Sequence, residues 1–239
     1  MTEQKKELAK TAPAGALAVP SYISDDREGL ETISKDDITV PRLALAQALS
    51  PEVTEGDPRL IPGLKPGQLF NSMTREIYGE SVTFQVLKKE PLRGMEFFSQ
   101  EEGGGVKDPN VPLDDPRLLW GEKGEKPEAT LFRDYIARLL PSGELIALSF
   151  KSSGIKVAKQ LNGLIALRGK AIYAGKYVIS TDVSLLPKPH KVYKVRNDGW
   201  VSEEDLNTGQ QLYRALREIK TEIDRGTLEG EVTSDEPPF

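Results

Sequence analysis

The sequence lacks several residue types and segments that common activities need. Its 239 residues include no cysteine, which excludes disulfides, thiolate nucleophiles, zinc fingers and iron–sulfur clusters. The only histidine is His190, and nothing near it in the sequence favours a metal site or a catalytic triad. No apolar run approaches the roughly 18 to 20 residues that cross a bilayer, and residues 1–10 are too charged for a signal peptide. We therefore expect a cytosolic protein that needs no cofactor and no membrane.

Motifs of the common nucleic-acid enzymes are also missing. The sequence has no GxxxxGK[ST] phosphate-binding loop, which argues against an ATP-driven recombinase or helicase. Asp108, Asp114 and Asp115 offer carboxylates for a metal-dependent nuclease, but acidic residues in a loop usually form turns or face solvent. We expect a protein without catalytic activity and keep the nuclease as the less favoured alternative.

Charge is distributed unevenly along the chain. The formal net charge is −5, which by itself argues against an anionic ligand. Residues 131–200, however, hold 12 basic and 4 acidic side chains, a net of +8, between a segment of net −7 (residues 1–130) and one of net −6 (residues 201–239). A basic central stretch between acidic arms points to an anionic partner.

Short β-like runs alternate with turn residues over most of the chain. Expected strands are residues 67–70, 81–89, 95–99, 130–140, 144–150, 173–186 and 191–195, with a turn at Pro141–Ser142–Gly143 and a long loop at 100–126. Apolar residues at helical spacing predict helices over 152–167 and 203–225. The pattern favours an α+β or mainly β fold with one internal and one C-terminal helix.

Four segments follow from this pattern. Residues 1–38 have no sustained period and are expected to form a flexible N-terminal arm. Residues 39–200 form the expected core, residues 201–226 the C-terminal helix, and residues 227–239 an acidic tail.

Basic and aromatic residues are interleaved in the core segment, as a groove for single-stranded nucleic acid requires. Cations follow the phosphates, and rings stack on unpaired bases. The candidate residues are Phe132, Arg133, Tyr135, Arg138, Lys151, Lys156, Lys159, Arg168, Lys176, Tyr177, Lys191, Tyr193, Lys194 and Arg196. For each tyrosine a place in the core is the commoner outcome, and single lysines are usually solvated. Lys156 and Lys159 are neighbours on one helix face, where a cap at Ser152 or Ser153 and the helix start offer a phosphate site.

The C-terminal tip is the most specific motif in the sequence. Four carboxylates and no basic residue lie between Glu229 and the terminal Phe239. Such an arm can place its aromatic tip in an apolar pocket while a basic rim binds its acids. The alternative is an ordinary solubilising tail that happens to end in Phe.

The ending Asp235–Glu236–Pro237–Pro238–Phe239 resembles the tip of bacterial single-stranded DNA-binding proteins and of tailed-phage replication proteins. Phage-encoded single-stranded DNA-binding proteins are similar to the chain at residues 38–43 (ITVPRL), 49–53 (LSPEV), 65–70 (KPGQLF) and 150–153 (FKSS). The resemblance implies a tip that docks replication, recombination and repair proteins and competes with DNA for the protein's own groove. The bacterial proteins have a shorter N-terminal barrel and a long Gly/Gln-rich linker, both absent here, so their tetrameric assembly does not carry over.

Together these features predict a non-enzymatic, phage-encoded single-stranded DNA-binding protein with an OB-like (oligonucleotide-binding) antiparallel barrel. Its expected partners in the host cytoplasm are single-stranded DNA, replication and recombination proteins, and further copies of itself in a homo-oligomer. A phage structural or accessory protein is the alternative.

Overall fold

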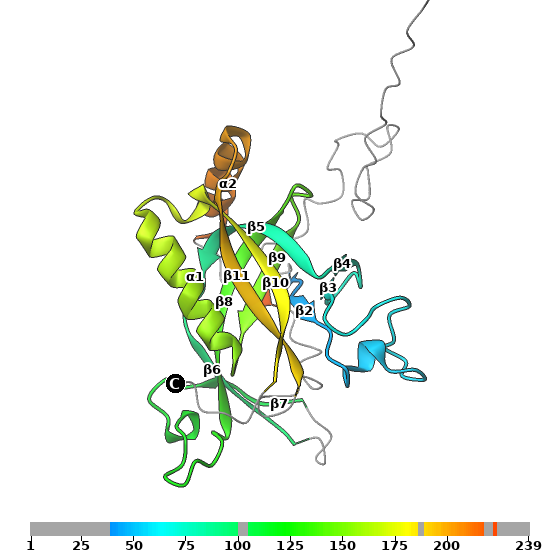
Figure 1. Cartoon of the computed structure of the whole chain (residues 1–239). Helices are drawn as coiled ribbons and strands as arrows, with labels where there is room; N and C mark the ends of the chain where they lie inside the picture. Colours follow the sequence, from blue (N-terminus) through cyan, green and yellow to red (C-terminus); the bar gives the residue numbers. More distant parts are fainter. Residues whose placement is uncertain (1–38, 100–104, 186–188, 218–221, 224–239) are drawn as a thin grey trace, which may run out of the picture.

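The computed structural model describes residues 39–99, 105–185, 189–217 and 222–223, and Figure 1 shows the chain. Its strands are β1 (Thr39–Val40), β2 (Leu43–Leu45), β3 (Leu69–Asn71), β4 (Ile77–Gly79), β5 (Ser81–Lys89), β6 (Arg93–Phe97), β7 (Val106–Val111), β8 (Ala129–Leu140), β9 (Leu145–Phe150), β10 (Gly175–Ser184), β11 (His190–Trp200) and β12 (Glu222–Ile223). The two α-helices are α1 (Gly154–Arg168) and α2 (Glu203–Leu216), and short 3-10 turns lie at η2 (Pro51–Val53), η4 (Pro116–Leu118) and η5 (Ile172–Ala174). The architecture is therefore mainly antiparallel β with two helices, as predicted.

The long strand β8 organises the main sheet. Its C-terminal half pairs with β5 on one side and β9 on the other, while its N-terminal half pairs with β6. The strand order is β11-β10-β5-β8-β6-β7, with β9 beside β8. The β8–β9 hairpin turns at the predicted Pro141–Ser142–Gly143, where Gly143 adopts a φ of 80°.

β2 lies between β9 and β11, which are the two ends of the β11-β10-β5-β8-β9 part of this sheet. A parallel bridge joins Arg42 to Ala147 of β9. On the other side, the Gln47 side chain donates to the carbonyl of Lys191 at 2.8 Å and accepts from its N–H at 2.9 Å. These are side-chain bonds to the β11 backbone, so strands surround the core in the described residues without forming a closed hydrogen-bonded barrel.

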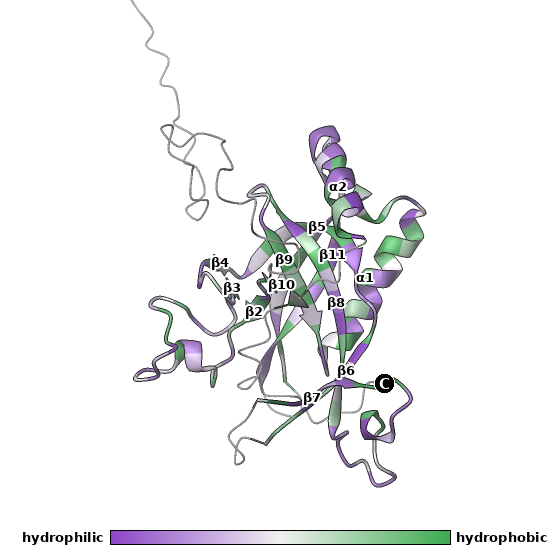
Figure 2. Cartoon of the chain, turned by 180° about the vertical axis from the view of Figure 1, so that it is seen from behind, coloured by the Kyte–Doolittle hydropathy of each residue, from purple (hydrophilic) through white to green (hydrophobic). Residues whose placement is uncertain are grey.

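The main core lies inside these strands and is covered at one end by α1. Its large fully buried side chains come from β3, β5, β8, β9, α1 and β10: Leu69, Phe84, Tyr135, Ile146, Leu148, Phe150, Leu161 and Tyr177. Hydrophobic and hydrophilic residues alternate along α1 in Figure 2 because only one face of the helix packs on the strands. Ser153 stands at the N-cap position of α1, but its hydroxyl makes no capping hydrogen bond, so the predicted serine cap at Ser153 is wrong.

A buried polar network attaches the three-stranded sheet β2-β3-β4 to the β8–β9 turn. Asn71 has no exposed surface, and its Nδ2 donates to Glu144 Oε1 at 2.6 Å and to Tyr78 Oη at 3.2 Å. Tyr78 donates in turn to Glu144 Oε2 at 2.7 Å. The Asn71 Oδ1 accepts from the backbone N–H groups of Met73 and Thr74, which shapes the β3–β4 turn. Burial and the bond to Glu144 raise the pKa of Tyr78 well above its ordinary value.

The C-terminal helix is shorter than predicted. α2 ends at Leu216, and Ile223 lies in β12, which pairs in parallel with β1 near the other end of the described chain. Ile223, Val40 and the partly buried Leu216 cover Ile136 and Ala147 on the outer face of β8 and β9. Helical periodicity in the sequence continues beyond Leu216, but burial of Ile223 on this sheet face favours an extended chain at Glu222–Ile223.

The expected loop at residues 100–126 also contains regular structure. β7 pairs with β6, and the two strands extend away from the helices together with η4 (Figure 1). β7 was missed because its side chains are mostly exposed, so its sequence has no apolar alternation to reveal it.

Candidate nucleic-acid interface

The predicted stacking aromatics fill the core. Phe132, Tyr135 and Tyr177 are each no more than 1% exposed. The Tyr135 hydroxyl bonds to the Ala158 carbonyl at 3.1 Å and to Asn162 Oδ1 at 2.9 Å, and burial raises its pKa to about 12. None of these three rings can stack on a base in this conformation, because Tyr135 and Tyr177 point into the main core and Phe132 packs with Met95 in a separate small cluster.

Tyr193 and Lys191 belong to the junction between β11 and β2. The Tyr193 ring packs edge-on against Phe150 with centroids 5.8 Å apart, and its hydroxyl donates to the Leu43 carbonyl at 3.2 Å. Lys191 makes the two backbone bonds to Gln47 described above. Their main contribution is therefore to the position of β2. Lys151 is half-buried between β9 and α1.

Several predicted cations have carboxylate partners. Arg138 donates to Asp205 of α2 at 2.7 Å, and both Lys176 and Arg196 bind Asp198, at 3.3 and 2.8 Å. Lys194 pairs with Asp182 across the β10–β11 hairpin. A phosphate would have to compete with these carboxylates, which lowers what each cation contributes to binding.

A second group of cations, on the α1 side, has no carboxylate partner within the described residues. Lys156 and Lys159 are exposed on one face of α1. Arg133 of β8 is half-buried close to α1, near enough to the Tyr135 hydroxyl to oppose the rise in its pKa. The Nε of Arg133 is buried without a hydrogen-bond partner. We call Arg133, Lys156 and Lys159 the α1 cation group.

Arg168, at the end of α1, forms a layered stack that sequence reasoning did not anticipate. Its guanidinium lies 5.0 Å from the centroid of the Tyr177 ring and 4.4 Å from that of Trp200. Trp200, which belongs to the same run of interleaved basic and aromatic residues in the sequence, is 57% exposed. The sequence pattern marks it as an aromatic residue among cations, but only the fold shows that its strand face is uncovered.

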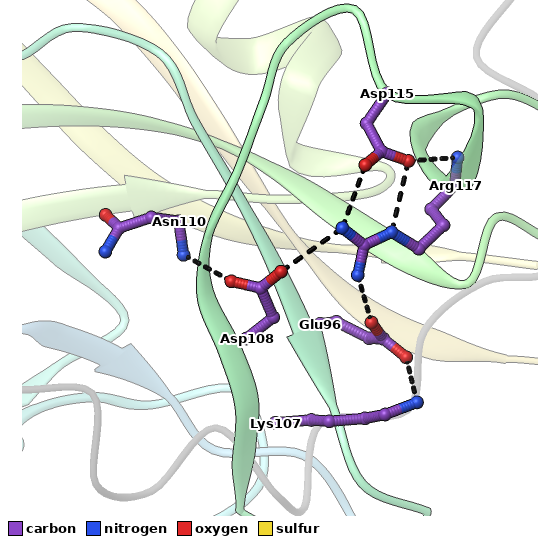
Figure 3. Close-up of polar contacts among 6 residues, drawn as sticks. All are labelled: Glu96, Lys107, Asp108, Asn110, Asp115 and Arg117. Carbon is purple, nitrogen blue, oxygen red and sulfur yellow. Dashed lines mark hydrogen bonds and ion pairs between the residues drawn. The ribbon is translucent and has the colours of Figure 1, made fainter.

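Two of the three acids considered for a nuclease, Asp108 and Asp115, contact an arginine instead of an open site (Figure 3), and Asp114 is exposed. Arg117 donates to both carboxylate oxygens of Asp115, at 3.1 and 2.8 Å, to Asp108 Oδ2 at 3.2 Å and to Glu96 Oε2 at 2.5 Å. Lys107 pairs with the other oxygen of Glu96. The guanidinium occupies the centre where a cation would bind, and no group of three potential metal ligands is found in the part of the chain that the structure describes.

This network gives the β6–β7 region an acid-sensitive anchor. Bonds from Lys107 and Arg117 lower the pKa of Glu96, and bonds from Arg117 lower that of Asp115. A carboxyl whose pKa is lowered by folding stabilises the protein fully at pH values above its ordinary pKa, which is 4.5 for Glu96 and 3.8 for Asp115. This stabilisation is lost as the pH falls through the lower pKa of the folded state. We expect Arg117→Met to lower the melting temperature by a few degrees at pH 7 and by much less near pH 3. Thermal unfolding followed by circular dichroism at both pH values checks this, and an equal loss at both would contradict it.

Part of the chain is similar to a known protein family. Residues 9–107 match the model of a family described as Pam3 phage gp34-like protein. This stretch resembles a phage protein. The matched residues include β1 to β6 and less than half of the chain, and they do not reach the α1 cation group or Trp200. No curated protein and no solved structure matches the chain.

Two further expectations concern other parts of the chain. The predicted partner-binding tip, residues 235–239, and the N-terminal arm, residues 1–38, lie outside the described residues. Neither described helix combines the length and the apolar character needed to cross a bilayer.

Proposed function

We propose that this protein binds single-stranded DNA without sequence preference, as a non-catalytic phage protein that acts in the host cytoplasm. The observation that carries the proposal is the α1 cation group, three cations without carboxylate partners in the described structure, within a stretch of net charge +8. Unpaired cations on one side of a compact core can each bind a phosphate without first losing a partner.

The order of the strands supports this proposal. In chain order, β5, β8, β9, α1, β10 and β11 are three antiparallel strands, a helix and a hairpin, and β10 returns to pair with β5. This connectivity is compatible with the five-stranded, partly open Greek-key barrel of the OB fold, in which oligonucleotides bind across the strands and the connecting loops. Here β2 and its side-chain bonds lie at the open seam.

The deciding experiment compares a labelled oligo-dT with its duplex by fluorescence anisotropy at low and high salt. The proposal expects tight binding of the single strand, weaker binding of the duplex, and a steep fall in affinity with salt. Absence of binding to either form would refute it. Equal binding to both forms would show that the basic stretch binds polyanions in general and does not prefer single strands, which would contradict the proposal.

A role for the acidic tail is part of the proposal. We expect its tip to recruit replication or recombination proteins and to compete with DNA for the basic surface. Deletion of residues 229–239, which removes four carboxylate side chains, should leave oligo-dT affinity unchanged or increase it, as measured by the same anisotropy titration. Weaker binding after the deletion would contradict the competition.

A phage structural or accessory protein is the second candidate, favoured by the family match, whose description names a phage protein without stating what it binds. It would show no salt-sensitive binding to oligonucleotides. A nuclease would cleave the strand in the presence of Mg²⁺ or Mn²⁺, whereas the proposed protein leaves it intact.

A further inference from the structure

From the layered stack at the end of α1 we infer that Trp200 is a stacking platform for one unpaired nucleobase. The inference rests on the proposed function and gives one aromatic residue of the basic stretch a specific role in it. Trp200 is the last residue of β11 and pairs with Gly175, the first residue of β10. The platform is therefore on the edge strand of the sheet, beside the C-terminal end of α1.

One face of the Trp200 ring is already occupied. The guanidinium of Arg168 lies over it, 4.4 Å from the ring centroid, and is held by bonds from Nη2 to the Asn197 side chain and the Gly199 carbonyl. The same guanidinium lies 5.0 Å from the centroid of the Tyr177 ring, which is itself buried in the core. The ring thus rests on a rigid support, so it can keep its orientation while its outer face meets a ligand.

The outer face of the ring is left to solvent. Trp200 is 57% exposed although Arg168 covers one face, and the neighbouring Leu167 is 87% exposed. An exposed indole ring whose orientation is fixed by its neighbours is suited to stack with another flat ring. An unpaired base offers such a ring, whereas a base within a duplex is already stacked on both sides.

The charges around the platform favour a nucleic acid over an apolar peptide. Arg168 lies over the ring, and Lys170, just after α1, is exposed. Along α1, Lys159 and Arg168 are nine residues apart, which is about 14 Å along the axis and two and a half turns, so their side chains leave opposite sides of the helix. A strand with phosphates on the α1 cation group and one base on Trp200 would therefore have to cross α1.

The test uses the full chain and a labelled oligo-dT, with Trp200→Leu as the variant. Trp120, half-buried near η4, provides a matched control, since Trp120→Leu makes the same change outside the proposed site. We expect Trp200→Leu to weaken single-strand binding by roughly tenfold and to leave the salt slope unchanged, because stacking releases no counterions. Trp120→Leu should bind like the wild type.

Fluorescence provides a readout that leaves Trp200 intact. In a Trp120→Phe protein Trp200 is the sole tryptophan, and oligo-dT should quench its emission in proportion to binding. Wild-type affinity in Trp200→Leu, or no quenching on binding, would overturn the platform while the proposed function stood. An equal loss of duplex binding would also overturn it, since the ligand would then not be an unpaired base. If the wild type bound no oligo-dT, both the stacking role of Trp200 and the proposed function would be refuted.

Discussion

Replacing Lys156 and Lys159 by glutamine is expected to weaken oligo-dT binding roughly 10- to 30-fold at about 0.1 M salt. Both side chains are exposed on one face of α1 and have no carboxylate partner in the described structure. Each lysine that meets a phosphate contributes about 0.7 to the slope of log affinity against log salt for a single strand. The double variant should therefore have a slope shallower by about 1.4, measured by anisotropy over a salt series.

The control for this prediction changes the same amount of charge elsewhere. Lys194 and Arg196 lie on β11 and are paired with Asp182 and Asp198. Their double glutamine variant should lose less affinity and less slope, because those cations already neutralise carboxylates. A larger loss in the β11 pair than in the α1 pair would move the interface to the outer face of the β10–β11 hairpin.

The largest expected effect on stability is that of Asn71→Ala, which should lower the free energy of unfolding by about 3–5 kcal/mol. Asn71 is fully buried, and the variant removes its bonds to Glu144 and Tyr78 together with those to the N–H groups of Met73 and Thr74. Several polar groups are then left without a partner at a site with little access to water. Urea unfolding followed by circular dichroism measures the change.

Two further variants sharpen this prediction. Asn110→Ala changes the same residue type at an exposed position in β7 and should stay within about 0.5 kcal/mol of the wild type. Asn71→Asp keeps the shape but places a second carboxyl beside Glu144, so it should destabilise more at pH 7 than at pH 5, where one carboxyl can bind a proton. A loss below 1 kcal/mol for Asn71→Ala would show that the network does not hold the β2-β3-β4 sheet in place.

The sequence by itself determined the local elements. β5 has the predicted bounds, the β8–β9 hairpin turns at its Pro-Ser-Gly segment, and α1 differs from its prediction by two residues at the start and one at the end. These features depend on alternation, helical spacing and turn chemistry, all of which act over a few neighbouring residues. The concentration of positive charge in residues 131–200 is likewise a property of the sequence.

The tertiary structure alone decided which of those charges and rings face a ligand. The alternation along a strand shows that neighbouring residues point to opposite faces, but it does not show which face other elements cover. Tyr135 and Tyr177 are therefore buried in the core, whereas Trp200 is exposed. Pairing of Arg138 with Asp205 joins residues that are far apart along the chain, and Lys194 contacts Asp182 only because the β10–β11 hairpin brings them together. β12 formed because Ile223 is buried beside Val40 on the outer face of the sheet, a contact between distant segments that helical spacing in the sequence does not reveal.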